Sequence, residues 1–213
     1  MNNPSLGCIP EEPHAGSFMY EAIAGGNELP DTFLIESVPT HYQNGQPCCT
    51  SSATSSAKGS REGKKLSPRA LWVMVKKDDG VVGGAYITTN LKKLIEYGIP
   101  EYGAISEDVH VPLEEYMNAV LSPNVLYKSK EHKSQSYWWI YKEDKDLQYV
   151  ALVNENIPLI LAMPWYKDYY GVNNGFLPEP KTFSGYHAVI LKGRAKDENG
   201  YYRVYQNSHD PKE

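Results

Sequence analysis

The sequence predicts an α+β fold in which helices come first and strands follow. Up to about residue 125, apolar residues recur at the i, i+3, i+4 spacing of amphipathic helices, and beyond residue 126 β-branched and aromatic residues gather in short runs. The 213 residues are 41% hydrophobic and 22% charged, a composition that supports a buried core. Helices followed by strands, rather than alternating with them, indicate an α+β class.

Four helices are expected in the first half. The run at 49–57 is made of small residues with alanine at i and i+4, which allows close packing of a buried helix. Pro68 suits the first position of the next helix, and Gly98 suits the C-terminal cap of the third. The expected ranges are 49–57, 68–79, 88–97 and 113–121.

The second half is expected to be mainly β-structure. Its runs are rich in valine, isoleucine, tyrosine and tryptophan. Asn199-Gly200 is typical of a hairpin turn, because both residues tolerate positive φ. The expected strands are 137–141, 157–163, 186–192 and 201–205, with one inserted helix at 144–154.

Composition also limits the partners. The net charge of −5 argues against a nucleic-acid surface, which needs a basic stripe. The longest apolar run, 157–165, contains two prolines and is too short for a bilayer span of about 20 residues. The N-terminus lacks the basic and apolar regions of a secretory signal, so the default compartment is the cytoplasm. No Cys-x-x-Cys or His-x-x-x-His spacing predicts a metal site, and no cofactor is expected.

Four residues are candidates for thiol chemistry. Cys49 stands at the predicted start of a helix, where the helix dipole lowers the pKa of a thiol. His187 opens an apolar strand, and Asn207 ends the next one, so a hairpin brings the amide beside the imidazole. Gln43, six residues before Cys49, is placed to donate to an oxyanion. Taken singly, Cys48 and Cys49 are equally well explained as buried apolar cysteines.

The other histidines are expected to be solvated, because they lie in polar stretches of the sequence. They are His14, His41, His110, His132 and His209.

Five segments, taken in order, resemble a papain-like cysteine peptidase, and specifically a bacterial-type member with a short N-terminal arm. The likeness covers roughly residues 29–208. The separation of 138 residues between Cys49 and His187 fits the spacing of about 130–150 in that family, and Asn207 lies slightly outside it. The segments are Gln43-Asn-Gly-Gln-Pro-Cys-Cys49, Ser67-Pro68, Gly83-Gly84 with the following LKKLIEYGI, Gly185-Tyr-His-Ala-Val-Ile190, and Glu198-Asn-Gly-Tyr-Tyr-Arg-Val-Tyr-Gln-Asn-Ser208.

The resemblance implies a two-lobe fold with its active site in the cleft. A helical lobe of about 47–125 and a β lobe of about 126–213 form one domain, 29–213, preceded by an arm at 1–28. In the implied triad Cys49 is the nucleophile, His187 the base and later the acid, and Asn207 the residue that orients it. Gln43 and the backbone N–H of Cys49 form the oxyanion hole. The implied activity is hydrolysis of peptide bonds through a covalent acyl-enzyme, by a monomer acting on a peptide or protein.

Some assignments concern the substrate groove. The resemblance implies that Gly83 and Gly84 border it and let an extended backbone approach, while Tyr186 is a pocket residue by its place beside His187. Side-chain preference, and the choice between endopeptidase and exopeptidase action, stay open. The arm is equally compatible with a free surface segment and with one packed on the body, and whether it inhibits is open.

The sequence also departs from the family pattern. Pro47-Cys48 replace the usual glycine and small residue before the nucleophile, and Thr50 follows it. His209 stands where a tryptophan usually shields the His–Asn hydrogen bond, so a wetter and weaker pair is expected. Cys48 is a competing nucleophile. These departures keep two alternatives open: a catalytically weak or inactive binding protein of the same fold, and, ranked lower, a peptidoglycan or isopeptide hydrolase with Cys–His chemistry.

Overall fold

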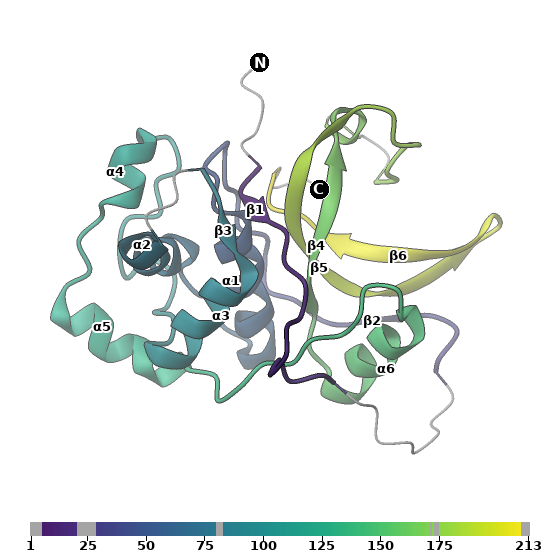
Figure 1. The fold of residues 1–213 in the computed structure, drawn as a ribbon, viewed down its shortest axis with the longest axis horizontal. Helices are drawn as coiled ribbons and strands as arrows, with labels where there is room; N and C mark the ends of the chain where they lie inside the picture. The colour runs from purple at the N-terminus through teal and green to yellow at the C-terminus, as the bar shows by residue number, and fades with distance from the viewer. Residues whose placement is uncertain (1–5, 21–28, 80–82, 171, 173–174, 210–213) are drawn as a thin grey trace.

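The structure consists of a helical part and an antiparallel sheet that face each other across an N-terminal segment (Figure 1). This computed structural model describes residues 6–20, 29–79, 83–170, 172 and 175–209. The predicted α+β class, with helices N-terminal and antiparallel strands C-terminal, is confirmed. We call α1 to α5 the helical lobe, and β2, β4, β5, β6 and α6 the β lobe.

The helical lobe is built from five helices, of which the sequence predicts four. The prediction for α1 is too short, and the one for α4 is too long. The helix that was not predicted, α5, begins with Ser122, whose side chain accepts a hydrogen bond from Val125 N, and Pro123 at the first helical position. The bounds are α1 Cys49–Glu62, α2 Pro68–Asp79, α3 Ile87–Glu96, α4 Leu113–Met117 and α5 Pro123–Ser129.

Helix α1 lies at the centre of the molecule. Its first eight residues, Cys49 to Ser56, are all buried, and it packs against α2, α3 and the sheet strand β5. Small side chains are needed there because three elements approach it closely. Behind α1 the helical lobe has its own apolar core, which includes the fully buried Leu71, Trp72, Ile99 and Tyr116.

The β lobe is organised around the long strand β5, which pairs antiparallel with the other three strands. The strands are β2 Phe33–Leu34, β4 Leu159–Tyr166, β5 Phe183–Asp197 and β6 Gly200–Gln206. The prediction of a strand at 137–141 is wrong. That segment forms one isolated bridge, between Trp139 and Met19, because it crosses between the lobes and meets no sheet edge.

The predicted hairpin and inserted helix are both found. Residues 198–199 connect β5 to β6, and the positive φ falls on Gly200 rather than on Asn199. Helix α6, Lys145–Glu155, is capped by Asp144, whose side chain accepts from Leu147 N at 2.9 Å. Its Leu152 packs in one cluster with Leu191 of β5. Two short 3-10 turns complete the chain, Lys130–His132 and Lys167–Tyr169.

The N-terminal segment packs on the body at Cys8–Ile9 and again at Met19 and Tyr20, whereas residues 14–16 between them are exposed. Strand β1, Cys8–Ile9, pairs in parallel with β3, Ala85–Tyr86, and in Figure 1 it descends between the two lobes. The predicted arm also includes residues 1–5 and 21–28, which lie outside the described residues. No helix in the described part of the chain is both long and apolar enough to cross a bilayer.

Candidate active site

Cys49 is placed at the first residue of α1, with Cys48 as the N-cap. The first N–H groups of a helix have no intrahelical partner, and the helix dipole adds positive potential there. Backbone N–H groups act on the Cys49 sulfur and lower its pKa; they belong to Ala188, Gly7, Thr50 and Cys49 itself. Ala188 follows His187 directly, so the sulfur lies against the strand that carries the imidazole.

The two neighbouring cysteines point into different parts of the molecule. Cys48 belongs to the core of the helical lobe, where its sulfur lies 3.6 Å from the Tyr116 hydroxyl and 3.9 Å from that of Ser52. Cys49 belongs to the cluster between the lobes, together with Ala188 and Ile190 of β5. Only the second position adjoins the strand of His187.

His187 and Asn207 meet as expected. Nε2 of His187 and Oδ1 of Asn207 are 2.7 Å apart, because β6 pairs with β5 and ends beside the histidine. His187 is completely buried, and burial lowers its pKa to about 4 although the bond to Asn207 raises it. It stands inside β5, opposite Met163 of β4, rather than at a strand end. Among the described residues, its Nδ1 has no hydrogen-bond partner.

Two aromatic rings enclose His187. The His209 ring stacks on it with centroids 3.8 Å apart and 28° between the planes. Trp165 meets His187 edge to face at 4.7 Å and meets His209 at 5.2 Å. The expectation of a wetter pair is therefore wrong for this structure: His209 is itself largely buried, and Trp165 is 2% exposed. Trp165 comes from β4, and the register of β4 against β5 brings it to His187. Sequence reasoning missed this contact because no short motif encodes that register.

Gln43 is tied to the end of β6. Its backbone N–H donates to Ser208 O at 2.9 Å, and its side-chain oxygen accepts from the Ser208 hydroxyl at 2.5 Å. Its side-chain nitrogen donates to Gln46 O at 2.8 Å. These bonds hold a buried amide in the loop before Cys49. They link it to Ser208, the residue that follows Asn207.

The N-terminal segment lies over Cys49. Gly7 O accepts from Ala85 N at 2.8 Å, and the N–H of Gly7 acts on the Cys49 sulfur. A methyl group on Gly7 would stand 1.9 Å from Pro47 O, so only glycine fits against the loop that leads to the nucleophile. Cys8 packs in the same cluster as Cys49, and Leu6 lies against Gly185.

Gly84 lies against this segment. A methyl group on Gly84 would stand 3.3 Å from Gly7 O, and Lys76 of α2 donates to Gly84 O. Gly83, in contrast, has open space at its Cα. Tyr186 is 36% exposed and packs edge to face on Phe183, with centroids 5.6 Å apart.

Farther along, the segment is anchored to the helical lobe and to the segment that crosses between the lobes. The Glu11 carboxylate accepts from Thr88 N at 3.0 Å, in the first turn of α3 where a negative charge is favoured, and also from the Thr88 hydroxyl. Trp139 N donates to Phe18 O, and Tyr20 N donates to Trp139 O, each at 2.8 Å.

Covering the nucleophile has an electrostatic consequence. Cys49 is fully buried, and burial raises the pKa of its thiol to about 11, outweighing the backbone N–H groups that lower it. A thiolate is the reactive form of cysteine. In this conformation the thiol is therefore protonated and shielded from solvent.

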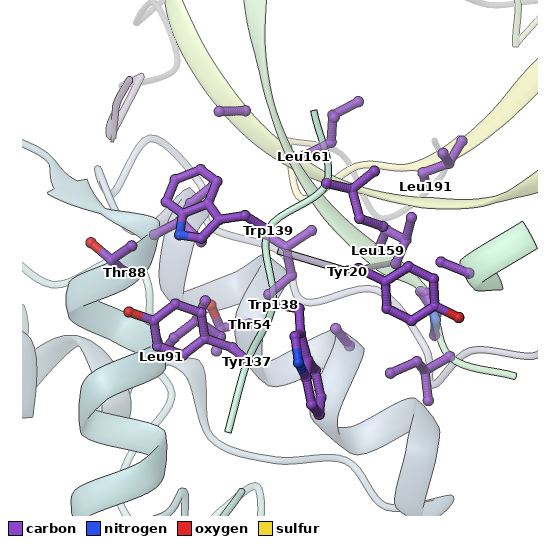
Figure 2. A pocket seen from close by; sticks show the side chains of 18 of the residues that line it. Tyr20, Thr54, Thr88, Leu91, Tyr137, Trp138, Trp139, Leu159, Leu161 and Leu191 are labelled. Atoms are coloured by element: carbon purple, nitrogen blue, oxygen red, sulfur yellow. The ribbon is translucent and has the colours of Figure 1, made fainter. Parts of the chain in front are cut away.

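A cavity of about 310 Å³ opens beside the covered nucleophile, between the lobes. Figure 2 shows its lining, with Thr88 and Leu91 from α3, Leu159 and Leu161 from β4, and Tyr20 from the N-terminal segment. Ile9 and Glu11 also line it, whereas Cys49 and His187 do not. Residues of the N-terminal segment thus form part of the cavity wall, and the catalytic candidates do not.

Besides His209, two more histidines differ from the expectation that they are solvated. His41 is 2% exposed and stacks on Tyr102 at 5.7 Å, while His132 is 5% exposed and its Nδ1 lies 2.6 Å from the Glu62 carboxylate. Neither contacts Cys49. Within the described ranges, no group of three or more His, Cys, Asp or Glu side chains is arranged to hold a metal ion.

The sequence matches no family model and no curated protein. Solved structures match it closely in fold. Xylellain, a cysteine protease from Xylella fastidiosa, is 21% identical with a TM-score of 0.80, over 97% of this chain and 85% of that one. Procathepsin B S9 from Trypanosoma congolense is 14% identical with a TM-score of 0.70, over 97% and 75%. Procathepsin L2 from the midgut of Tenebrio molitor larvae is 17% identical with a TM-score of 0.69, over 96% and 68%.

These structures agree with the expected resemblance, and at such identities they establish the architecture alone. With its helical part, its antiparallel sheet and the inter-lobe position of Cys49, the chain has the fold of papain-like cysteine proteases.

Proposed function

We propose that this protein is a cysteine-type peptidase with Cys49 as its nucleophile. The observation that carries the proposal is the order of groups along the cleft. The Cys49 sulfur lies against Ala188, the neighbouring residue His187 is bonded to Asn207, and Nδ1 of His187 is left without a partner in the described residues. Cys48 lacks these neighbours, because it is turned into the helical core.

The reaction is acyl transfer. His187 takes the proton of Cys49, and the thiolate attacks the peptide carbonyl to give a tetrahedral oxyanion. The N–H of Cys49 and the side-chain amide of Gln43 stabilise that oxyanion. When it collapses, His187 gives its proton to the leaving amine and a thioester remains on Cys49. Water, deprotonated by His187, then releases the carboxylic acid and restores the thiol.

A peptide substrate would occupy the path that Leu6 to Ile9 now take. There the edge of β3 bonds an extended backbone, as Ala85 N does with Gly7 O. Gly84 leaves room for that backbone. Turnover therefore requires the N-terminal segment to leave the cleft, which also exposes Cys49 and removes the burial that raises its pKa.

The decisive experiment compares two alanine variants. Wild-type protein, Cys49→Ala and Cys48→Ala are treated with an epoxide thiol probe and assayed on a peptide library. Labelling and hydrolysis should vanish in Cys49→Ala and persist in Cys48→Ala, and fragmentation of the labelled wild type should place the adduct on residue 49. Continued labelling and cleavage by Cys49→Ala would refute the assignment.

A non-catalytic binding protein of the same fold is the second candidate. The full burial of Cys49 beneath the N-terminal segment, with its raised pKa, favours it. The pH dependence of Cys49 alkylation separates the two. An ion pair with His187 gives reactivity below pH 6, whereas a binding protein shows a single rise near the ordinary thiol pKa of about 8.5.

A further inference from the structure

We propose that Trp165 and His209 are positioning residues that together fix the ring of His187 so that its Nδ1 edge faces the cleft. The proposal rests on the proposed function, since it concerns how the base of that reaction is held. Its basis is the arrangement of three rings, in which His187 is stacked on His209 and closed off edge-on by Trp165.

Hydrogen bonding alone does not fix this ring. The χ2 torsion of histidine is broad, and His187 has one in-plane bond, from Nε2 to Asn207. A rotation of the ring would break that bond and turn Nδ1 away. His209 covers one face of the ring at 3.8 Å, and the perpendicular Trp165 contacts both imidazoles. Rotation therefore requires two other aromatic side chains to move first.

The positions of the two residues follow from strand register. Trp165 lies on β4 opposite Gly185, two residues from the pair that Met163 makes with His187. Trp165 and Met163 therefore lie on the same face of β4, which places the indole diagonally across from His187. His209 follows Asn207 by two residues, and its N–H lies 3.3 Å from Asn207 Oδ1, the same oxygen that faces His187. The Asn207 amide oxygen thus contacts both the ring of His187 and the backbone N–H of His209.

The rings of Trp165 and His209 must also tolerate the positive charge that His187 acquires when it takes the proton from Cys49. The groups around the two rings carry no charge near neutral pH: Trp165 from β4, Tyr170 after the second 3-10 turn, and the amide of Asn207. Burial, followed by the charge of His187, lowers the pKa of His209 to about 2. His209 thus stays neutral while His187 is protonated, and the stack does not oppose the ion pair.

The test measures the pH dependence of Cys49 alkylation by iodoacetamide in the full chain, with the adduct located by peptide mass. Alkylation occurs when the N-terminal segment leaves the cleft, so the profile reports the Cys49–His187 pair in that conformation, where burial no longer raises the pKa of the thiol. Trp165→Leu and His209→Leu remove a ring, whereas Trp165→Phe and His209→Phe keep one. We expect each leucine variant to lose about tenfold of the reactivity below pH 6, so that its profile approaches a single rise near pH 8.5. The phenylalanine variants should recover most of the wild-type profile.

Phe33→Leu is the matched control, because it removes one ring of an edge-on pair with Tyr149 elsewhere in the β lobe. It should lower the melting temperature without changing the profile. Folded leucine variants that keep the wild-type profile would overturn the proposal. Should both leucine variants fail to fold, His209→Ala decides, because it removes the stacking ring at a position less buried than Trp165: it should lose acid-side reactivity, and an unchanged profile counts against the enclosure. A single rise in the wild type would instead contradict the proposed function.

Discussion

The two lobes hold their reacting groups by different means. In the helical lobe, Cys49 owes its position to backbone: it begins α1, and main-chain N–H groups surround its sulfur. In the β lobe, His187 owes its position to three side chains from two segments of the chain: Asn207 and His209 after β6, and Trp165 on β4. The sulfur is fixed by where a helix starts, whereas the imidazole is fixed by what packs around it.

This difference teaches where the site is sensitive to substitution. Changing a side chain near Cys49 leaves the N–H groups of the helix start in place. Changing a side chain near His187 removes part of the support itself. Substitutions around the imidazole should therefore alter the protonation and reactivity of the site, while substitutions in the helical core should mainly alter the free energy of unfolding.

The largest effect on activity is expected when the imidazole of His187 is removed. His187→Gln keeps a buried polar side chain of similar size but cannot accept the thiol proton. Its kcat/KM on a peptide substrate should fall about 10²–10⁴-fold, the usual contribution of a general base. The exposed His14 provides the control, and His14→Gln should keep wild-type kinetics. Wild-type kinetics in His187→Gln would assign the base to another group.

The difference between the lobes also explains how much the sequence could predict. Helix starts are encoded locally, so Pro68 and the small residues after Cys49 predicted α2 and the position of α1 correctly. The hairpin from β5 to β6 is local as well, and it brought Asn207 to His187 as predicted. Local signals were enough wherever the pairing partner is the next element along the chain.

What the sequence could not predict depends on contacts between distant segments. The run 137–141 has strand-like composition, yet among the described residues it forms one isolated bridge, in which Trp139 bonds to Phe18 and Tyr20 of the N-terminal segment, and joins no sheet. Trp165 encloses His187 through the register of β4, which no short motif encodes. The covering of Cys49 by Gly7 depends on a fit between a glycine and Pro47 that is visible only once both are placed.

A second prediction concerns the segment that covers the site from outside both lobes. Gly7→Ala introduces a methyl group 1.9 Å from Pro47 O, a contact that the backbone must relieve by moving the segment. Alkylation of Cys49 should then become about tenfold faster or more, each tenfold corresponding to about 1.4 kcal/mol of lost segment binding. Intact mass against time with iodoacetamide measures it.

Gly16→Ala is the control for backbone strain in the same segment: nothing lies within 4 Å of the added methyl group, but Gly16 has a φ of +97°, so alanine strains an exposed turn that does not touch Pro47. Its alkylation rate should equal that of the wild type. An unchanged rate in Gly7→Ala, with the protein folded, would show that the segment does not limit access to the sulfur.

The smallest predicted effect concerns His41, which is buried like His187 and His209 but lies outside the proposed site. The effect is on the pH dependence of stability. His41 lies in the loop before α1, and burial lowers its pKa to about 3, with a smaller contribution from Lys65. In the unfolded chain a histidine titrates near 6.5. Between these values the unfolded state binds a proton that the folded state refuses, so stability falls as the pH falls from about 6.5 toward 3.

His41→Phe keeps a ring to stack on Tyr102 and removes this proton. Denaturant unfolding at several pH values should show the acid-side slope reduced by up to about 1.4 kcal/mol per pH unit, with little change above pH 6.5. The alkylation profile of Cys49 should stay that of the wild type, because His41 supports neither the sulfur nor the imidazole. A change in that profile would mean that the loop before α1 helps to hold the reacting groups, and the division between backbone and side-chain support would no longer follow the division between the lobes.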